Sequence, residues 1–323
     1  MRKIKIGSAW PLGSSITPNG VNFSVAAPYA SSLELLIFKN ENDDQPLETV
    51  TLNQANRSGD YWHVELEGLK EGCLYGYKVC LENNEKNNSL ILDPCARGIS
   101  GWNNYIRDHK KDSAKSYKHY LKGIVTERNY FNFKSHPRPK HKWNKTIIYE
   151  LHVGGFTKNH DSNISENKKG TFIGLIEKIP YLKSLGITTI ELLPIFAFDI
   201  YDAPKGLTNY WGYSPINWFT PHQGFIAGLN PFDARNQFKK FVEVCHDNQL
   251  EVILDVVYNH TAEGNKNGPI ISWKGFGNQT YYHLDDNKNF QDVSGCGNSI
   301  SANLPLVRKL IIESLRCWAI ELG

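Results

Sequence analysis

The pattern of hydrophobic and polar positions changes character near residue 140. Before that point, hydrophobic and polar residues alternate in short runs bounded by turn residues, at 21–26, 33–38, 61–66 and 74–79. Alternation with a period of two is typical of half-buried β-strands. We therefore predict an antiparallel β-sandwich over residues 1–102. Residues 103–145 are rich in Lys, His, Asn and Pro and show little strand or helix pattern, which predicts a connector.

After residue 145 the pattern becomes strand, helix, strand, helix. Continuous hydrophobic runs at 147–153, 187–193 and 250–257 predict buried strands. Between and after them lie helical patterns, which carry Leu175, Ile176, Ile179, Leu182 and Leu185, then Phe238, Phe241, Val242 and Cys245, then Leu306, Leu310, Ile311, Leu315, Trp318 and Leu322. The first helix is expected to end at Gly186 in a left-handed conformation, and the third to open at Pro305.

Alternating strands and helices predict a parallel sheet. A nucleotide-binding doubly wound sheet is disfavoured, because no strand is followed by a G-x-G-x-x-G or Walker A sequence. The multidomain fold expected is therefore a sandwich followed, over residues 146–323, by the first three βα units of an incomplete TIM (β/α)8 barrel. On this interpretation the chain stops before strand four.

Composition narrows the possible partners. A net charge of +3 without clustered basic residues argues against nucleic acid. No hydrophobic run approaches the roughly 20 residues of a membrane span, and no hydrophobic segment follows the charged amino terminus, so neither a membrane partner nor a secretory signal is expected. The six cysteines lack any metal-ligand spacing. We expect a cytoplasmic protein with reduced thiols, no bound metal and no cofactor.

In a parallel barrel, functional side chains gather at the carboxyl ends of the strands and in the loops that follow. The first strand leads to His152 and Gly154-Gly155, and the third leads to Asp255-Val-Val-Tyr-Asn-His260. A strand continuing through this last segment would direct Asp255, Val257 and Asn259 to one side and leave His260 on a loop at the rim.

Each candidate also has a purely structural interpretation. A strand-end carboxylate such as Asp255 often caps the next element. A single histidine after an asparagine is more often a surface residue, and Tyr213 alone would more often be a core aromatic. Glu150 and Glu191 lie inside predicted strands, and we expect each to be a buried member of a pair.

Several motifs, in order along the chain, resemble one enzyme family. Asp255-Val-Val-Tyr-Asn-His resembles the first conserved region of the α-amylase superfamily (glycoside hydrolase family 13). The isoamylase and bacterial glycogen debranching branch is indicated by the run from Asn259 to Asn265 and by Ser294-Gly-Cys-Gly-Asn298. Asn209-Tyr-Trp-Gly-Tyr213 fits the same branch.

Motifs of the amino-terminal region extend this resemblance. Trp10-Pro-Leu-Gly, Gly20-Val-Asn-Phe-Ser, Tyr75-Gly-Tyr and Leu92-Asp-Pro-Cys-Ala-Arg97 are similar to the glycogen-binding-type sandwich that precedes the barrel in these enzymes. One departure is Asn303-Leu-Pro, where the debranching relatives usually have Asn-His-Pro.

The resemblance implies a retaining glycosidase, in which two carboxyl groups about 5–5.5 Å apart break the bond. It implies no catalytic residue here, because the nucleophile, the acid/base and the third carboxylate would lie beyond Gly323. Tyr213 would stack under the sugar and His260 would hydrogen-bond it, with Asp255 and Asn259 organising the site. Trp211 is a further substrate-binding candidate. The role of His152 stays open.

The function implied is hydrolysis of α-1,6 branch linkages in glycogen, a branched α-glucan or a limit dextrin. The alternatives are a glucan branching transglycosylase, an α-amylase-like endo-hydrolase, or, for this stretch alone, a non-catalytic glucan-binding module. The chain by itself is expected to be inactive. The interpretation requires Tyr213 and His260 to grip the same sugar ring.

Overall fold

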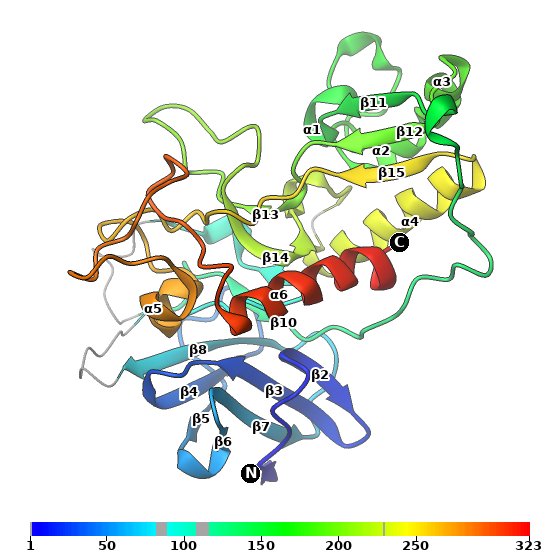
Figure 1. Ribbon diagram of the computed structural model, residues 1–323. Helices are drawn as coiled ribbons and strands as arrows, with labels where there is room; N and C mark the ends of the chain where they lie inside the picture. Colours follow the sequence, from blue (N-terminus) through cyan, green and yellow to red (C-terminus); the bar gives the residue numbers. More distant parts are fainter. Residues whose placement is uncertain (1, 82–88, 108–115, 229) are drawn as a thin grey trace. The chain divides into compact units, whose positions relative to one another are not determined.

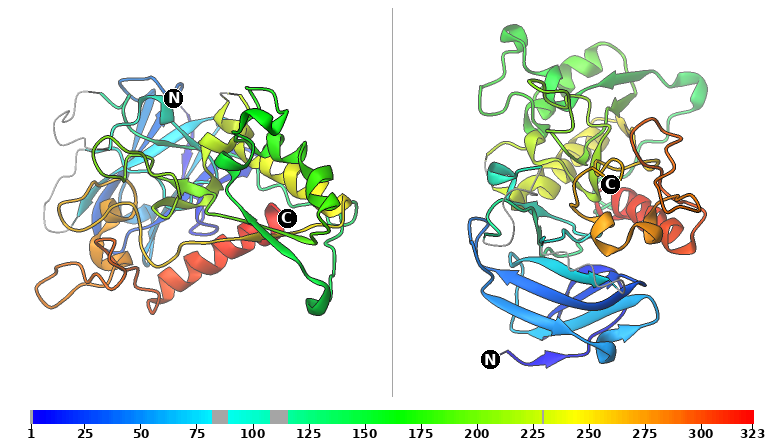
Figure 2. Two further views of the ribbon diagram at one scale, coloured as in Figure 1. Left: turned by 90° about the horizontal axis from the view of Figure 1, so that it is seen from above. Right: turned by 90° about the vertical axis from the view of Figure 1, so that its left-hand side faces the viewer.

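The computed structural model describes residues 2–81, 89–107, 116–228 and 230–323 (Figures 1 and 2). The chain divides into two compact units, each built from three segments that are not contiguous in the sequence. Unit 1 comprises Met1–Arg128, Ile216–Phe219 and Tyr258–Ile312, and unit 2 comprises Asn129–Pro215, Thr220–Val257 and Glu313–Gly323.

Unit 1 contains two antiparallel sheets, drawn in blue and cyan in Figure 1. The first has the order β1 (Ile4–Lys5), β7 (Tyr61–Glu67), β3 (Gly20–Ala26), β2 (Gly13–Thr17), with β6 (Arg57–Ser58) also paired to β7. The second has the order β5 (Glu48–Leu52), β4 (Ala30–Phe38), β8 (Leu74–Leu81), β10 (Lys122–Ile124), β9 (Ile99–Ser100). The predicted sandwich is confirmed. Strand β10 lies within the predicted connector, so that segment contributes to the sheet.

Strand β3 is buried along its whole length, on its polar face as well as its apolar one. The segment that precedes β2 covers this face. The Asn22 side chain accepts a hydrogen bond from the Ser8 amide (2.7 Å) and donates to the Ser8 carbonyl (2.9 Å), and Ser24 donates to the Ala9 carbonyl (2.8 Å). Buried polar groups are tolerated when they are hydrogen-bonded in this way.

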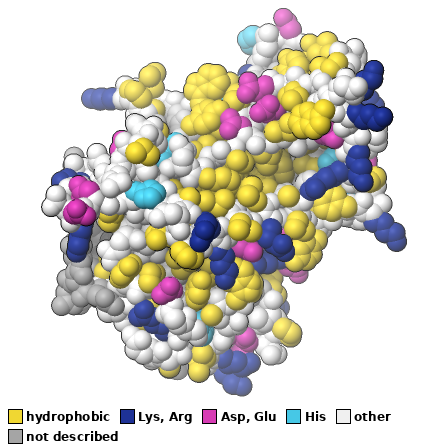
Figure 3. Space-filling view, viewed as in Figure 1, with side chains coloured by type: hydrophobic (Ala, Val, Ile, Leu, Met, Phe, Trp, Pro, Cys, Tyr) yellow, Lys and Arg dark blue, Asp and Glu magenta, His cyan; other side chains and the backbone are white. Residues whose placement is uncertain are grey.

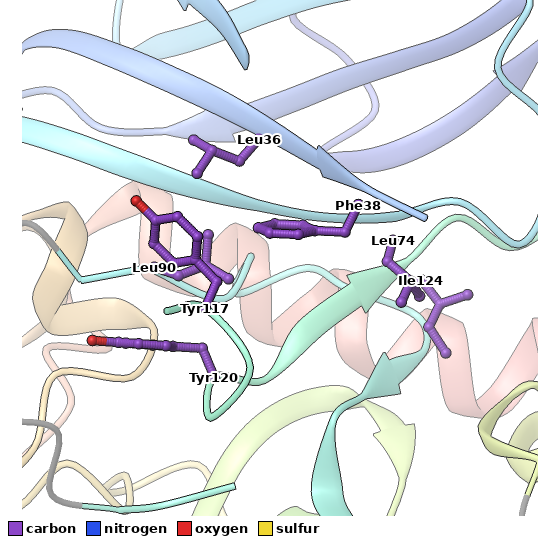
Figure 4. Packing of buried hydrophobic residues seen from close by; sticks show 7 residues of the cluster. All are labelled: Leu36, Phe38, Leu74, Leu90, Tyr117, Tyr120 and Ile124. Carbon is purple, nitrogen blue, oxygen red and sulfur yellow. The ribbon is translucent and has the colours of Figure 1, made fainter. Parts of the chain in front are cut away.

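The second sheet of unit 1 is partly covered on its other face as well. A cluster on the face shown in Figure 4 joins β4 and β8 to the segment before β10 and consists of Leu36, Phe38, Leu74, Leu90, Tyr117, Tyr120 and Ile124. Beside it the buried Lys122 ammonium donates to the carbonyls of Glu41 (2.9 Å) and Tyr117 (2.7 Å). Burial lowers the pKa of Lys122 to about 8, against the opposing charges of Glu41 and Asp43.

Apart from α6, described below, the helical segments that the described residues of unit 1 form are short. They include the 3-10 turns Gln54–Asn56, Trp102–Asn104 and Trp273–Phe276 and the helix α5 (Asn278–Tyr281). Residues 258–312 belong to the same unit as the sandwich, and the parallel sheet that precedes them in the chain belongs to the other unit.

Unit 2 contains a parallel sheet with the order β11 (Ile148–Leu151), β12 (Thr189–Leu192), β15 (Glu251–Leu254). Its helices are α1 (Val153–Phe156), α2 (Phe172–Ile176), α3 (Ile179–Ser184) and α4 (Ala234–Asp247), with 3-10 turns at Trp143–Lys145, His160–Ser162, Gln223–Phe225 and Pro231–Asp233. The parallel βα pattern predicted from the sequence is confirmed.

Three further elements complete the fold. Strand β13 (Phe196–Phe198) lies in unit 2, and the residues of β14 (Pro215–Pro221) and of α6 (Pro305–Arg316) are divided between the two units. A π-helical turn, Cys317–Glu321, follows α6. None of the described helices combines the length and the hydropathy that a membrane span requires.

The first predicted helix of unit 2 is interrupted. Helix α2 ends at Ile176, and α3 begins at Ile179 with Pro180 in its first turn. Proline has no amide hydrogen and its ring clashes with the preceding turn, so it can begin a helix but cannot continue one. Gly186 has the expected left-handed conformation (φ 78°). Leu185, predicted to face the core, lies outside α3 and is 48% exposed, so that prediction is wrong.

The buried carboxyl of Asp93 makes the stability of unit 1 depend on pH. It accepts hydrogen bonds from the Tyr75 hydroxyl (2.9 Å) and the Cys95 amide (2.8 Å). Burial raises the pKa of Asp93 to about 6, although these bonds and the charges of Arg97 and Arg128 oppose the shift. A carboxyl whose folded pKa is raised stabilises the fold below its unfolded pKa, and this contribution is lost as pH rises through the folded value.

We expect unit 1 of the wild type to lose roughly 2 kcal/mol of unfolding free energy, through Asp93, between about pH 4 and pH 6.5. Asp93→Asn should remove this dependence. Urea unfolding at both pH values measures it, and the same substitution at the exposed Asp60 is the control. An Asp93→Asn variant with the wild-type pH dependence would contradict the assignment.

Candidate functional site

The strand ends of unit 2 carry an aromatic stack. His152 follows β11 directly, and its ring stacks on Tyr210 with centroids 4.1 Å apart and planes at 17°. Its Nε2 donates to the Tyr210 carbonyl at 2.8 Å. Burial lowers the pKa of His152 below its usual value, with the Tyr210 carbonyl acting in the opposite direction. His152 is therefore neutral near pH 7, with Nδ1 as the acceptor nitrogen.

Two glycines make room for this stack. A Cβ on Gly155 would lie 2.1 Å from the Tyr210 hydroxyl, and a Cβ on Gly154 would lie 2.9 Å from Cε1 of His152. At distances this short a side chain at either position would force the neighbouring ring to shift. The Gly154-Gly155 pair seen in the sequence is explained by the approach of these two rings.

The Asn209–Tyr213 motif forms a turn held by its first residue. The Asn209 side chain accepts from the Gly212 amide (3.1 Å) and donates to the Asp199 carbonyl (3.2 Å). Gly212 has φ 82°, a left-handed conformation that favours glycine. The turn presents Trp211, which is 57% exposed and meets the Tyr210 ring edge-on with centroids 5.6 Å apart. An exposed indole of this kind offers a flat apolar platform.

Tyr213 and Asp255 are brought together. The Tyr213 hydroxyl donates a short hydrogen bond to the Asp255 carboxylate. Desolvation first, then this bond and the charges of Asp255, Glu150 and Glu191, raise the pKa of Tyr213 to about 12. The ring is 41% exposed. Tyr213 thus stays protonated and keeps a partly open face beside Asp255.

Glu150 and Glu191 face each other in the β11–β12 register. Glu150 is exposed and Glu191 is half-buried. The prediction of a buried pair is therefore wrong for Glu150. The error arose because β11 is the terminal strand of the sheet, so its side chains are not covered as a central strand's would be.

Asn259 and His260 belong to unit 1. Strand β15 ends at Leu254, so the expected alternation from Asp255 to Asn259 does not apply. Asn259 is exposed, and its carbonyl accepts the Ile300 amide at 2.9 Å. His260 is 6% exposed and not at an open rim, and its Nδ1 lies 3.0 Å from Oδ1 of Asn259.

A buried carboxylate organises the loop that follows His260. Glu263 is fully buried, and its two oxygens accept the amides of Ile271 (2.7 Å), Ser272 (2.8 Å) and Lys274 (3.0 Å) and the Tyr282 hydroxyl (2.6 Å). Four donors on one carboxylate compensate for the burial of its charge. Residues 261–282 are thereby fixed around a single side chain.

Asn298, the last residue of the Gly-Cys-Gly-Asn motif, holds the same loop from the other side. It accepts the Thr261 amide and donates to the carbonyls of Thr261 and Gly264, each at 3.0 Å. Asp292 accepts the Gly297 amide (2.9 Å) and so shapes the approach to Asn298. The motif has a structural role, since it fixes the residue after His260.

Some sequence-predicted residues are therefore assembled within one unit. Tyr213 and Asp255 are in contact and Trp211 lies on the same short motif, all in unit 2. The shared grip of Tyr213 and His260 on one sugar stays a prediction, because these residues fall in different units. Sequence reasoning left His152 open and overlooked Tyr210 and Glu263. The sequence signal for Glu263 is an acidic residue inside a glycine-rich segment that has no helical pattern.

The clash that Gly155 avoids can be tested. Gly155→Ala should destabilise unit 2 by about 1–3 kcal/mol, because the new methyl group overlaps the Tyr210 hydroxyl. Tyr210→Phe removes that oxygen and leaves the ring, whose Cζ is 3.5 Å from the added carbon. We expect the double variant to recover most of the loss in a urea titration. Equal destabilisation with and without Tyr210→Phe would contradict the packing described here.

Glu263→Gln should weaken the loop that carries His260. The amide nitrogen of glutamine cannot accept a hydrogen bond, so at least one donor loses its partner, at a cost of about 2 kcal/mol or more. Hydrogen exchange should accelerate at the amides of Ile271, Ser272 or Lys274. Glu166→Gln is the matched control, because the Glu166 side chain is 85% exposed. Unchanged exchange in Glu263→Gln would refute the role assigned to this carboxylate.

Comparison with known proteins finds similar domains and relatives. Residues 155–299 match the alpha amylase catalytic domain, and residues 11–96 match carbohydrate-binding module 48, the isoamylase N-terminal domain. Isoamylase 1 (chloroplastic) of Oryza sativa is 36% identical over 99% of this chain and 41% of its own length. The glycogen debranching enzyme of Pectobacterium atrosepticum is 35% identical over 98% of this chain and 49% of its own.

The fold agrees with these matches. Pullulanase from Paenibacillus barengoltzii superposes with a TM-score of 0.79 over 98% of this chain and 47% of its own, at 24% identity. The chain spans half or less of the length of these relatives. The chain is therefore similar to the α-amylase family of glycoside hydrolases, with a segment like module 48 ahead of a segment like part of the catalytic domain.

Proposed function

We propose that this chain is part of a debranching enzyme that hydrolyses α-1,6 branch linkages of glycogen or a related branched α-glucan, with retention of configuration. The observation that carries the proposal is identity of 35–36% to isoamylases and glycogen debranching enzymes across nearly the whole chain. A role in glycogen catabolism follows from that activity. No residue of this chain is assigned as the nucleophile or the acid/base.

The residues of this chain would hold the glucan. Trp211 and Tyr213 supply exposed aromatic faces, on which a pyranose ring can stack through its apolar C–H face. Asp255 orients the protonated Tyr213 through a hydrogen bond. The neutral His152 ring stacks on Tyr210 and so supports the ring next to Trp211. His260, held by Asn259 and by the loop around Glu263, would supply the hydrogen bond to a sugar hydroxyl.

A cytosolic location is also proposed. No disulfide joins any of the six cysteines, all of which lie in the described part of the chain, and this fits a reducing compartment. Recovery of the native protein outside the soluble cytosolic fraction would contradict it.

The activity can be tested with a chimera in which this chain replaces the matched segment of the Pectobacterium atrosepticum enzyme. We expect reducing ends to be released from glycogen at least about tenfold faster than from linear amylose. Equal rates would favour an α-amylase-like endo-hydrolase. Transfer of glucan chains without a net gain in reducing ends would favour a branching transglycosylase. The isolated 323-residue chain should show no turnover of either substrate.

Binding tests the site separately from hydrolysis. Calorimetry of the isolated chain with maltohexaose should show a loss of affinity of about five- to thirtyfold in Trp211→Ala, since truncating a key aromatic contact costs about 1–2 kcal/mol. Trp143→Ala is the matched control, because Trp143 is 84% exposed but precedes β11, at the amino end of the strands. Equal losses in the two variants would argue against the platform.

A further inference from the structure

The loop that joins β13 to β14, residues 199–214, is closed by its own hydrogen bonds and lies wholly in unit 2 (Figure 1). At its base the Asp199 amide donates to the Ser214 carbonyl (3.0 Å). Further out the Asn209 amide donates to the Ile200 carbonyl (2.9 Å). The limb that leaves β13 and the limb that leads into β14 therefore lie side by side. This segment is called the β13–β14 loop.

Acidic side chains fix the limb that leaves β13. The Asp199 carboxylate accepts the Tyr201 amide (2.9 Å), and the Asp202 carboxylate accepts a short hydrogen bond from the Ser214 hydroxyl. The backbone on both sides of Tyr201 is thus held before any ligand arrives. Ordering of a loop is one of the costs of binding, and this loop is already ordered by its own bonds.

Large apolar side chains are exposed on the β13–β14 loop. They are Tyr201 (48% exposed), Leu207 (67%), Tyr210 (50%) and Trp211 (57%). Leu207 lies at the tip, where its amide donates to the Pro204 carbonyl (3.0 Å). Figure 3 shows hydrophobic side chains on the surface where Figure 1 places this loop. Single exposed apolar residues are normal, but four on one short loop indicate a binding surface.

Tyr201 and Tyr210 flank the same hydrogen bond. Tyr201 follows Ile200, whose carbonyl accepts the Asn209 amide, and Tyr210 follows Asn209. The Tyr210 ring in turn meets Trp211 edge-on. Tyr201 therefore lies on the limb opposite Trp211, beside the residues that present this indole. A ligand that contacts both limbs must be longer than one that covers Trp211 alone.

The chemistry of this surface fits an α-glucan. The rings of Tyr201 and Trp211 offer flat faces to the apolar C–H face of a pyranose. A charged ligand is not favoured, because Lys205 is the one basic residue of the loop and the carboxylates of Asp199 and Asp202 bond within it. The surface is also continuous with the candidate site, since Trp211 belongs to both.

We propose that Tyr201 is a specificity-determining residue that contacts α-glucan chains too long for Trp211 alone to cover, so that long outer branches bind more tightly than short ones. The inference rests on the proposed function, because it takes the strand-end site of unit 2 to bind α-glucan, and it adds the preferred chain length. The effect of Tyr201 falls on binding and not on bond cleavage.

Calorimetry of the full 323-residue chain with maltotriose and maltohexaose tests the preference. The wild type should bind maltohexaose at least about fivefold more tightly than maltotriose. Tyr201→Ala should weaken maltohexaose binding about five- to thirtyfold and maltotriose binding less than about twofold, as expected for one aromatic contact. Trp211→Ala should weaken both. A wild type without the preference, or equal losses for the two ligands in Tyr201→Ala, overturns the proposal.

Two further variants separate the ring from other effects. Tyr201→Phe keeps the stacking face and should change each affinity less than about twofold. Tyr181→Ala is the matched control, because Tyr181 lies on α3 of the same unit and is 51% exposed. Losses in either variant as large as those in Tyr201→Ala would refute the assignment. Circular dichroism and urea midpoints show whether each variant folds.

The chimera with the Pectobacterium atrosepticum enzyme separates the chain-length preference from the activity. In it, Tyr201→Ala should raise KM for glycogen about five- to thirtyfold and leave kcat within about twofold, because only binding is lost. Glycogen trimmed to short outer branches should show no such rise in KM. An active chimera whose KM for glycogen is unaffected by Tyr201→Ala would support the activity and refute the inference.

Other results also have a definite meaning. A chimera that releases no reducing ends, while the isolated chain keeps the preference in binding, would support the inference and count against the proposed activity. A chain that binds neither oligosaccharide overturns the inference, and the activity is then judged by the chimera alone. Self-association that Tyr201→Ala abolishes, with maltohexaose binding unchanged, would assign the loop to a protein contact and overturn the proposal.

Discussion

The in-register parallel pairing of β11, β12 and β15 is the constraint on which the candidate site depends. It brings the carboxyl ends of three strands to one edge of the sheet, although they are separated by about a hundred residues of chain in total. His152 and Asp255 follow the first and third strands, and the loop after β12 brings Tyr213 to Asp255. A slip of one residue in this register would direct these side chains to the other face.

At this edge the local sequence also positions aromatic rings, in addition to charged side chains. Gly154 and Gly155 allow His152 to stack on Tyr210, and the Gly212 turn presents Trp211 beside the same ring. Glycine is needed for two different reasons, close approach of the rings at Gly154 and Gly155 and a left-handed backbone at Gly212. The short segments near residues 154 and 212 thus act as one aromatic support, although neither is regular enough to show a periodic pattern.

Much of this arrangement could be predicted from the sequence, because it rests on hydrophobic periodicity. The sandwich, the three parallel strands and the end of the first helix at Gly186 all follow from local pattern. The interruption at Pro180 was also readable from a single residue. The burial of Asn22 and Ser24 was not, because it depends on a distant segment that covers β3. Periodicity describes one element and says nothing of what covers its second face.

The same limit applies to the polar residues of the site. Glu263 looks like an ordinary loop carboxylate, and only the folded chain shows four donors converging on it. Asn298 was recognised as part of a motif, but its contacts with Thr261 and Gly264 reveal why the motif is needed. Long-range polar contacts of this kind leave no periodic trace in a sequence.

The electrostatics of unit 2 limit what Tyr213 can do. Three carboxylates act on its hydroxyl, and with its pKa raised to about 12 the neutral phenol is favoured at and well above neutral pH. A phenol in this state donates one hydrogen bond, to Asp255, and offers its ring to an apolar ligand face. Proton transfer at neutral pH requires a group whose pKa lies near the working pH. The pKa of Tyr213, about 12, is too high for this role. The chemistry available to this residue is therefore binding and orientation.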